Sequence, residues 1–109
     1  MEFGLNDKTM GLIRSVLSAF PEIDQAILYG SRAKGSFKNG SDVDLTLIGN
    51  NLNQTVLFQL MDKIDDLMLP YSFDISIFEQ VSNPDFRAHV NRVGKSIYEK
   101  NKPINYSDL

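Results

Sequence analysis

The chain contains no cysteine and only one histidine, His89. The absence of cysteine excludes a disulfide framework, and a single histidine leaves no basis for a zinc site of the Cys/His type. The missing cysteines also agree with a reducing compartment. Neither disulfides nor a Cys/His zinc cluster therefore holds this fold together.

Long apolar segments are absent as well. No uninterrupted apolar run approaches the roughly 18 residues of a membrane-spanning helix, and no basic stretch with an apolar run follows Met1 and Glu2. We therefore expect a cytoplasmic protein with no membrane partner. The length of 109 residues predicts a single domain, 1–109, with one modest core and no room for a separate substrate-binding domain.

Basic residues are fewer than acidic ones, at 11 Lys and Arg against 14 Asp and Glu. The formal net charge is −3, and the sequence pI is about 5.0. Nucleic acid and anionic membrane surfaces attract basic proteins, so this balance disfavours both as partners.

The apolar pattern predicts helices and strands in alternation. Helices are expected over 7–19, 56–68 and 84–93, with one helical turn at 31–35; strands are expected at 26–29, 43–48, 71–78 and 96–98, with a loosely held tail from about residue 101. This order predicts an α/β (α+β) domain: a small mixed β-sheet of three to four strands, with helices packed on one face.

Two of the predicted strands have one apolar and one polar face. Side chains alternate between the two faces of a strand. Along the strand 43–48 and the residue just before it, Asp42, Asp44 and Thr46 therefore lie opposite the apolar residues. Asp74 lies likewise in the strand 71–78. If these strands are neighbours with their apolar faces on the core, the three aspartates gather on a single open face.

Three carboxylates on one face need a counter-charge. Two unit charges about 6 Å apart repel by roughly 3 kcal/mol at an effective dielectric constant of about 20. A proton or a divalent cation relieves this cost, and hard oxygen ligands favour Mg²⁺, or alternatively Mn²⁺. Two such ions can clamp the attacking and leaving oxygens of an in-line displacement. We therefore interpret Asp42, Asp44 and Asp74 as metal ligands and catalytic groups.

The dipeptide Gly30-Ser31 suits a phosphate-binding turn. Glycine lets the backbone approach a phosphate closely, and a helix that begins here directs free N–H groups at the anion. The hydroxyl of Ser31 adds a donor, and Arg32 and Lys34 lie near enough in sequence to help neutralise a triphosphate. A Gly-Ser pair alone is more often an ordinary turn, and Asp-x-Asp alone is more often surface charge. Their combination favours a nucleoside triphosphate with metal ions.

These residues carry a family resemblance. The runs GSRAKG (residues 30–35) and SDVDL (residues 41–45) closely resemble the signature of the DNA polymerase beta-like nucleotidyltransferase superfamily. The short chain is similar to the minimal nucleotidyltransferase (MNT) group, and GKSIY (residues 94–98) also resembles the end of that group's domain. The resemblance covers about residues 26–78 and implies the nucleotidyltransferase fold.

The resemblance also implies roles for individual residues. Gly30 and Ser31 correspond to phosphate binding, Asp42 and Asp44 to the metal-ligand pair, and Asp74 to the third carboxylate. The implied activity is Mg²⁺-dependent transfer of a nucleoside monophosphate to a hydroxyl acceptor, with ATP as the expected donor and two metal ions.

A protein partner is a further implication of the resemblance. Minimal nucleotidyltransferases are often paired with a small helical HEPN-domain protein as the antitoxin of a toxin–antitoxin system, and some transfer AMP onto a tyrosine of the toxin. The alternative is a non-catalytic module that binds a nucleotide and neutralises a HEPN-type protein by complex formation. A nucleic-acid or small-molecule acceptor is a third reading. We interpret His89 as a surface or half-buried histidine without a catalytic role.

Overall fold

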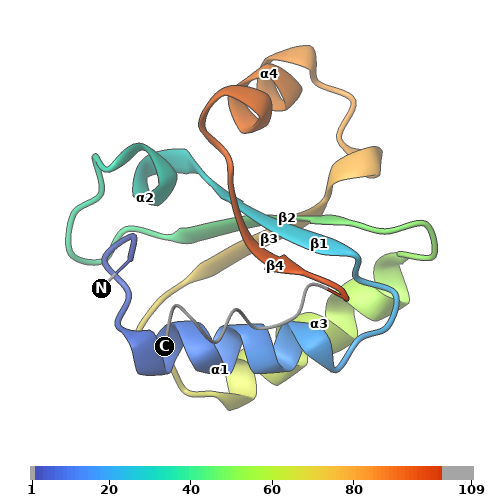
Figure 1. Ribbon diagram of the computed structural model, residues 1–109, viewed down its shortest axis with the longest axis horizontal. Helices are drawn as coiled ribbons and strands as arrows, with labels where there is room; N and C mark the ends of the chain where they lie inside the picture. Colours follow the sequence, from blue (N-terminus) through green and yellow to red (C-terminus); the bar gives the residue numbers. More distant parts are fainter. Residues whose placement is uncertain (1, 102–109) are drawn as a thin grey trace.

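The computed structural model describes residues 2–101 (Figure 1). Within this range the elements are α1 (Asp7–Ser18), β1 (Gln25–Tyr29), α2 (Gly30–Lys34), β2 (Val43–Ile48), α3 (Gln54–Asp66), β3 (Phe73–Ile77), the 3₁₀ helix η1 (Phe78–Gln80), α4 (Pro84–Val93) and β4 (Lys95–Glu99). Each predicted element is present. The strand expected over 71–78 is shorter than predicted because η1 begins at Phe78, and most of the predicted tail, 102–109, lies outside the described residues.

Asparagine side chains begin the longer helices. Asn6, Asn53 and Asn83 each accept a hydrogen bond from a backbone N–H in the first turn of α1, α3 and α4. Such caps satisfy donors that have no partner within the helix. The cap at Asn53 explains why α3 begins at Gln54, two residues before the apolar stripe that predicted it.

The four strands form one mixed sheet in the order β3-β2-β1-β4. β1 is antiparallel to both β2 and β4, whereas β2 and β3 are parallel. A parallel pair needs a crossover connection, and α3 supplies it between β2 and β3. The small mixed sheet predicted from the sequence is confirmed.

One face of the sheet carries the core. Figure 1 shows α1 and α3 together beneath this face. Buried apolar side chains from both helices and from the strands fill the space between them, including Ile13, Leu17, Leu45, Leu47 and Leu60, each 0% exposed. Full burial of one such side chain is worth roughly 1.5–3 kcal/mol. This layer therefore fixes the sheet on which the polar residues stand.

The opposite face is only partly open. Figure 1 shows α4 above it, and a methyl group added at Gly94 would lie 2.7 Å from a methyl carbon of Ile27. Thr46 is 0% exposed, and its hydroxyl accepts a hydrogen bond of 3.1 Å from Ser76. The expectation of an open polar face is therefore wrong at Thr46, whereas Asp42 and Asp74 are exposed.

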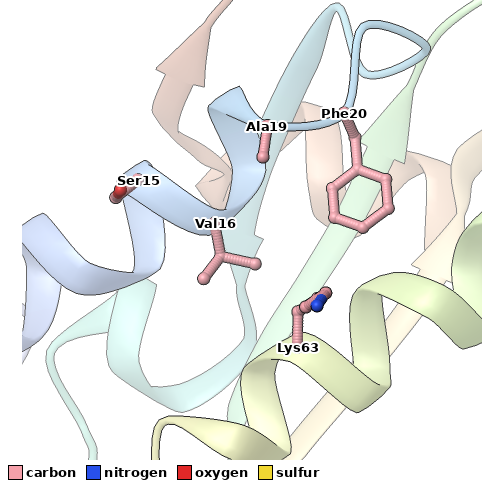
Figure 2. A pocket seen from close by; sticks show the side chains of 5 residues that line it. All are labelled: Ser15, Val16, Ala19, Phe20 and Lys63. Carbon is pink, nitrogen blue, oxygen red and sulfur yellow. The ribbon is translucent and has the colours of Figure 1, made fainter.

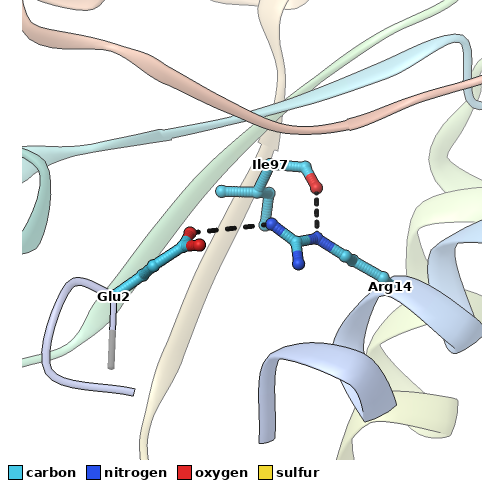
Figure 3. A network of polar contacts seen from close by, with 3 residues as sticks. All are labelled: Glu2, Arg14 and Ile97. Carbon is cyan, nitrogen blue, oxygen red and sulfur yellow. Dashed lines mark hydrogen bonds and ion pairs between the residues drawn. The ribbon is translucent and has the colours of Figure 1, made fainter. Parts of the chain in front are cut away.

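Arg14 joins the N-terminal segment and the edge strand to the helix layer. Its Nε donates a hydrogen bond of 2.7 Å to the carbonyl of Ile97, and Nη2 lies 3.8 Å from the Glu2 carboxylate (Figure 3). The ion pair is largely solvent-exposed, so its contribution to stability is small. The bond to Ile97 links α1 to β4.

No described helix has the length and apolar character needed to cross a membrane.

Candidate active site

Asp44 is the centre of the polar cluster. In the antiparallel ladder it stands opposite Tyr29, and in the parallel ladder it is in register with Asp74. Asp42 lies just before the first residue of β2. Strand neighbours are about 4.8 Å apart, so the register brings Asp44 and Asp74 together on the face away from the core.

The electrostatics of Asp44 reflect this crowding. Burial raises the pKa of the Asp44 carboxyl, and the charges of Asp74 and Asp42 raise it further, while Arg32 opposes the shift. Both main causes disfavour the ionised form. A cation placed at this carboxylate would lower the cost of keeping it charged.

The donor set suits a magnesium ion that also binds substrate. Carboxylate oxygens are the hard ligands that Mg²⁺ prefers, and Mg²⁺ usually takes only one or two protein carboxylates beside water and substrate phosphates. Within residues 2–101, no group of three or more His, Asp or Glu side chains is arranged to enclose an ion on its own. Asp44 with Asp42 or Asp74 thus fits a site that nucleotide phosphates would complete.

Gly30 stands directly against Asp44. Its φ is +75°, a left-handed conformation that L side chains rarely adopt, and a Cβ added here would collide with Oδ2 of Asp44. Gly30 begins α2, one residue before the helical turn predicted at 31–35, and Ser31 is the second residue of that helix. The backbone therefore turns at the carboxylate cluster at a position where only glycine fits.

Arg32 lies inside the fold. It is 3% exposed, and its Nε and Nη2 donate to the carbonyl of Ser41 at 3.1 and 2.8 Å, while Nη1 donates to the carbonyl of Phe3 at 2.9 Å. The guanidinium lies 5.3 and 5.0 Å from the ring centroids of Phe37 and Tyr71. Arg32 thus fastens the peptide just before Asp42. Its predicted contact with phosphate stays a prediction.

Lys34 differs from Arg32 in its surroundings. It lies in the last turn of the five-residue helix α2 and is exposed to solvent. An exposed ammonium group on a flexible stem can follow an anion, whereas a buried guanidinium that donates to two backbone carbonyls is held in place. Lys34 is therefore the better placed of the two cations predicted to neutralise a triphosphate.

Two side chains near the cluster were not predicted from the sequence. Tyr29 lies across the ladder from Asp44, and burial, followed by the charge of Asp74, raises the pKa of its phenol to about 12. His89, on α4, accepts a hydrogen bond of 3.1 Å at Nε2 from the N–H of Gly30. The position of Tyr29 just before Gly30 is the one feature of the sequence that could have indicated its place near the site. No local motif indicates His89, which lies 59 residues from Gly30 in the sequence.

A hollow on the opposite side of the sheet is separate from this cluster. It measures about 330 Å³ and is lined by Ser15, Val16, Ala19, Phe20 and Lys63. Figure 2 shows it between the helices α1 and α3. These helices cover the core face, so the hollow has no carboxylate of the cluster in its wall.

Comparison with known proteins places the chain in a family. The family model "Polymerase beta, Nucleotidyltransferase" matches residues 12–103. Because this match spans most of the chain, the protein belongs to the polymerase beta nucleotidyltransferase family. The resemblance drawn from residues 30–35 and 41–45 is thereby confirmed. No curated protein sequence matches the chain.

Solved structures share the fold at low sequence identity. A chain of a toxin–antitoxin crystal structure with AMP-PNP is 19% identical, with a TM-score of 0.65 over 89% of this chain and 76% of that one. A chain from the structure of tri-AMPylated Shewanella oneidensis HEPN toxin in complex with MNT antitoxin is 15% identical, with a TM-score of 0.65 over 87% of this chain and 73% of that one. A putative nucleotidyltransferase from Sulfolobus solfataricus matches at 16% and 0.56, over 87% and 81%.

Proposed function

We propose that this protein is a Mg²⁺-dependent nucleotidyltransferase that transfers AMP from ATP to a hydroxyl group of a partner protein. The observation that carries the proposal is the register of the parallel pair. It sets Asp44 beside Asp74, at the point where Gly30 turns the backbone against the Asp44 carboxylate. This arrangement supports a site in which the carboxylates would hold a metal ion and the turn at Gly30 would hold phosphate.

Each residue has a distinct part in the proposed reaction. Asp42 and Asp44 would hold magnesium, which neutralises phosphate charge and orients the triphosphate when it is bound. The hydroxyl of Ser31 and the backbone amides that follow Gly30 in the first turn of α2 would donate to phosphate oxygens, since the first amides of a helix have no partner within it. The exposed Lys34 would add a mobile positive charge.

Asp74 would act on the acceptor. The acceptor oxygen attacks the α-phosphorus, a new P–O bond forms, and the bond to the bridging oxygen breaks, so pyrophosphate leaves. The proton of the hydroxyl passes to Asp74, which orients the attacking oxygen and is exposed enough to reach it. A positioned base of this kind contributes about 10²–10⁴-fold to the rate.

A HEPN-type protein is the proposed acceptor. The chain has the fold of proteins crystallised with AMP-PNP and with an AMPylated HEPN toxin. An acceptor supplied by a partner would also suit a domain whose exposed carboxylates, Asp42 and Asp74, lie at its surface. In this proposal the protein acts as an antitoxin by modifying its partner.

The test is transfer of label from α-labelled ATP in the presence of Mg²⁺, with and without a purified HEPN-type protein. We expect label on the partner and release of pyrophosphate, with loss of both in Asp44→Asn. A wild-type protein that binds the partner tightly but transfers no label would favour the alternative, a module that neutralises the partner by binding alone.

A further inference from the structure

The side chain of His89 holds the backbone that leads into the phosphate-binding turn. Its Nε2 accepts a hydrogen bond of 3.1 Å from the N–H of Gly30. A neutral imidazole that accepts at Nε2 carries its proton on Nδ1. The bond therefore fixes the plane of the peptide between Tyr29 and Gly30, immediately before Ser31.

Gly30 is held from two directions. His89 binds its N–H from α4, and Asp44 occupies the space on the side where a Cβ would stand. A shift of this peptide would move Gly30 relative to the Asp44 carboxylate and would redirect the amides that follow it. The hydrogen bond to His89 thus sets the geometry between the turn and the proposed metal ligand.

Aromatic contacts hold α4 in the position that this bond needs. The ring of Tyr29 packs edge-on against Phe86 at 5.1 Å and against His89 at 6.0 Å between centroids. The ring centroid of Phe86 also lies 6.3 Å from that of Phe78, the first residue of η1. Arg87 donates to the carbonyl of Phe78. These contacts fix the helix above the sheet, so His89 has a defined place.

We propose that His89 is a positioning residue for nucleotide transfer: it orients the Tyr29–Gly30 peptide so that the amides from Ser31 onward face the triphosphate beside Asp44. Gly30's own N–H is engaged by His89 and is not among the phosphate donors. The inference rests on the proposed function. It gives α4 a role in the site, although α4 lies outside the motif at residues 30–35 and 41–45.

The test compares His89→Leu with His89→Gln. Leucine removes the acceptor, whereas the glutamine side-chain oxygen can take the position of Nε2. Asn91→Leu is the control, because Asn91 is an exposed residue of the same helix. Three measurements are made: the backbone amide resonance of labelled Gly30, calorimetric titration with Mg-ATP, and thermal unfolding.

We expect His89→Leu to shift the Gly30 amide resonance and to weaken Mg-ATP binding by about tenfold, the upper range for one hydrogen bond. His89→Gln should recover most of this affinity, and Asn91→Leu should behave as the wild type. A purely structural role would lower the unfolding temperature of both His89 variants without restoring binding in the glutamine variant.

Two outcomes overturn the proposal in different ways. If His89→Leu binds Mg-ATP like the wild type while Asp44→Asn loses affinity, the proposed function stands and the role of His89 is wrong. If the wild type itself shows no Mg²⁺-dependent binding of ATP, the proposed function fails and the inference fails with it.

Discussion

The two faces of β2 carry opposite kinds of residue on one backbone. Val43, Leu45 and Leu47 are all 0% exposed and lie against the helix layer. On the other face, burial and then the charges of neighbouring aspartates raise the pKa of Asp44. The first face stabilises the fold through burial. The second stands at an electrostatic cost that a cation would relieve. We therefore expect that substitutions at alternate residues of one strand change either the stability or the proposed activity.

The largest expected effect on stability comes from the core face. Leu45→Ala leaves a cavity in a fully buried site and should lower the free energy of unfolding by about 2–5 kcal/mol. Phe58→Ala, at a position 60% exposed, is the matched control and should change it by less than about 0.5 kcal/mol. Chemical denaturation measures both. Equal effects would mean that the core does not lie where the structure has it.

Arg32 is charged, but it is buried and we expect it to contribute to stability, as the core face of β2 does. Arg32→Leu leaves the carbonyls of Ser41 and Phe3 without their donors and should cost about 1–3 kcal/mol of unfolding free energy. Lys34→Leu, on the exposed part of the same helix, should leave stability unchanged and weaken ATP binding in a salt-dependent way. Denaturation and titration at two salt concentrations measure the pair. If Arg32→Leu weakens binding with no loss of stability, its main role is on the phosphate.

Two glycines with similar φ values allow the effect of backbone strain to be distinguished from the effect of contact with Asp44. Gly30 and Gly35 have φ values of +75° and +83°, but a Cβ collides with Asp44 only at Gly30 and meets nothing within 4 Å at Gly35. Both alanine variants pay about 1–2 kcal/mol for the left-handed conformation. Only Gly30→Ala should also weaken Mg-ATP binding, by at least about tenfold, since it displaces the Asp44 carboxylate. If calorimetric titration gave equal Mg-ATP affinities for the two variants, the turn at Gly30 would not be part of the phosphate site.

The smallest expected effect is the dependence of stability on pH. The pKa of Asp44 is raised in the folded state, so at neutral pH its charge disfavours folding. This cost is lost as the pH falls through the folded pKa, and it is absent below the unfolded pKa. Without Mg²⁺, Asp44→Asn should therefore unfold at a higher temperature than the wild type at pH 7, and the difference should shrink toward pH 4. A variant less stable at pH 7 would contradict this electrostatic account.

Local pattern was enough to predict the elements and the facing of the aspartates. The alternation in residues 43–48 predicted β2 with its observed bounds, and Asn83 and Gly94 correctly predicted the ends of α4. The register of Asp44 with Asp74 needed the parallel pairing of β2 and β3, which alternation allows but does not specify. The burial of Arg32 and the bond from Gly30 to His89 depend on contacts between distant segments, so no local motif indicated them.

We propose that Asp44 and Asp74, which are in register on one face, perform nucleotide transfer rather than nucleotide binding alone. The most direct test is Asp74→Asn, with the rate of label transfer from α-labelled ATP to a HEPN-type partner measured beside Mg-ATP affinity. We expect a transfer rate about 10²–10⁴-fold lower, with much of the affinity kept, because in the proposed reaction Asp74 acts on the attacking hydroxyl in the transition state. Undiminished transfer in Asp74→Asn would contradict this proposal.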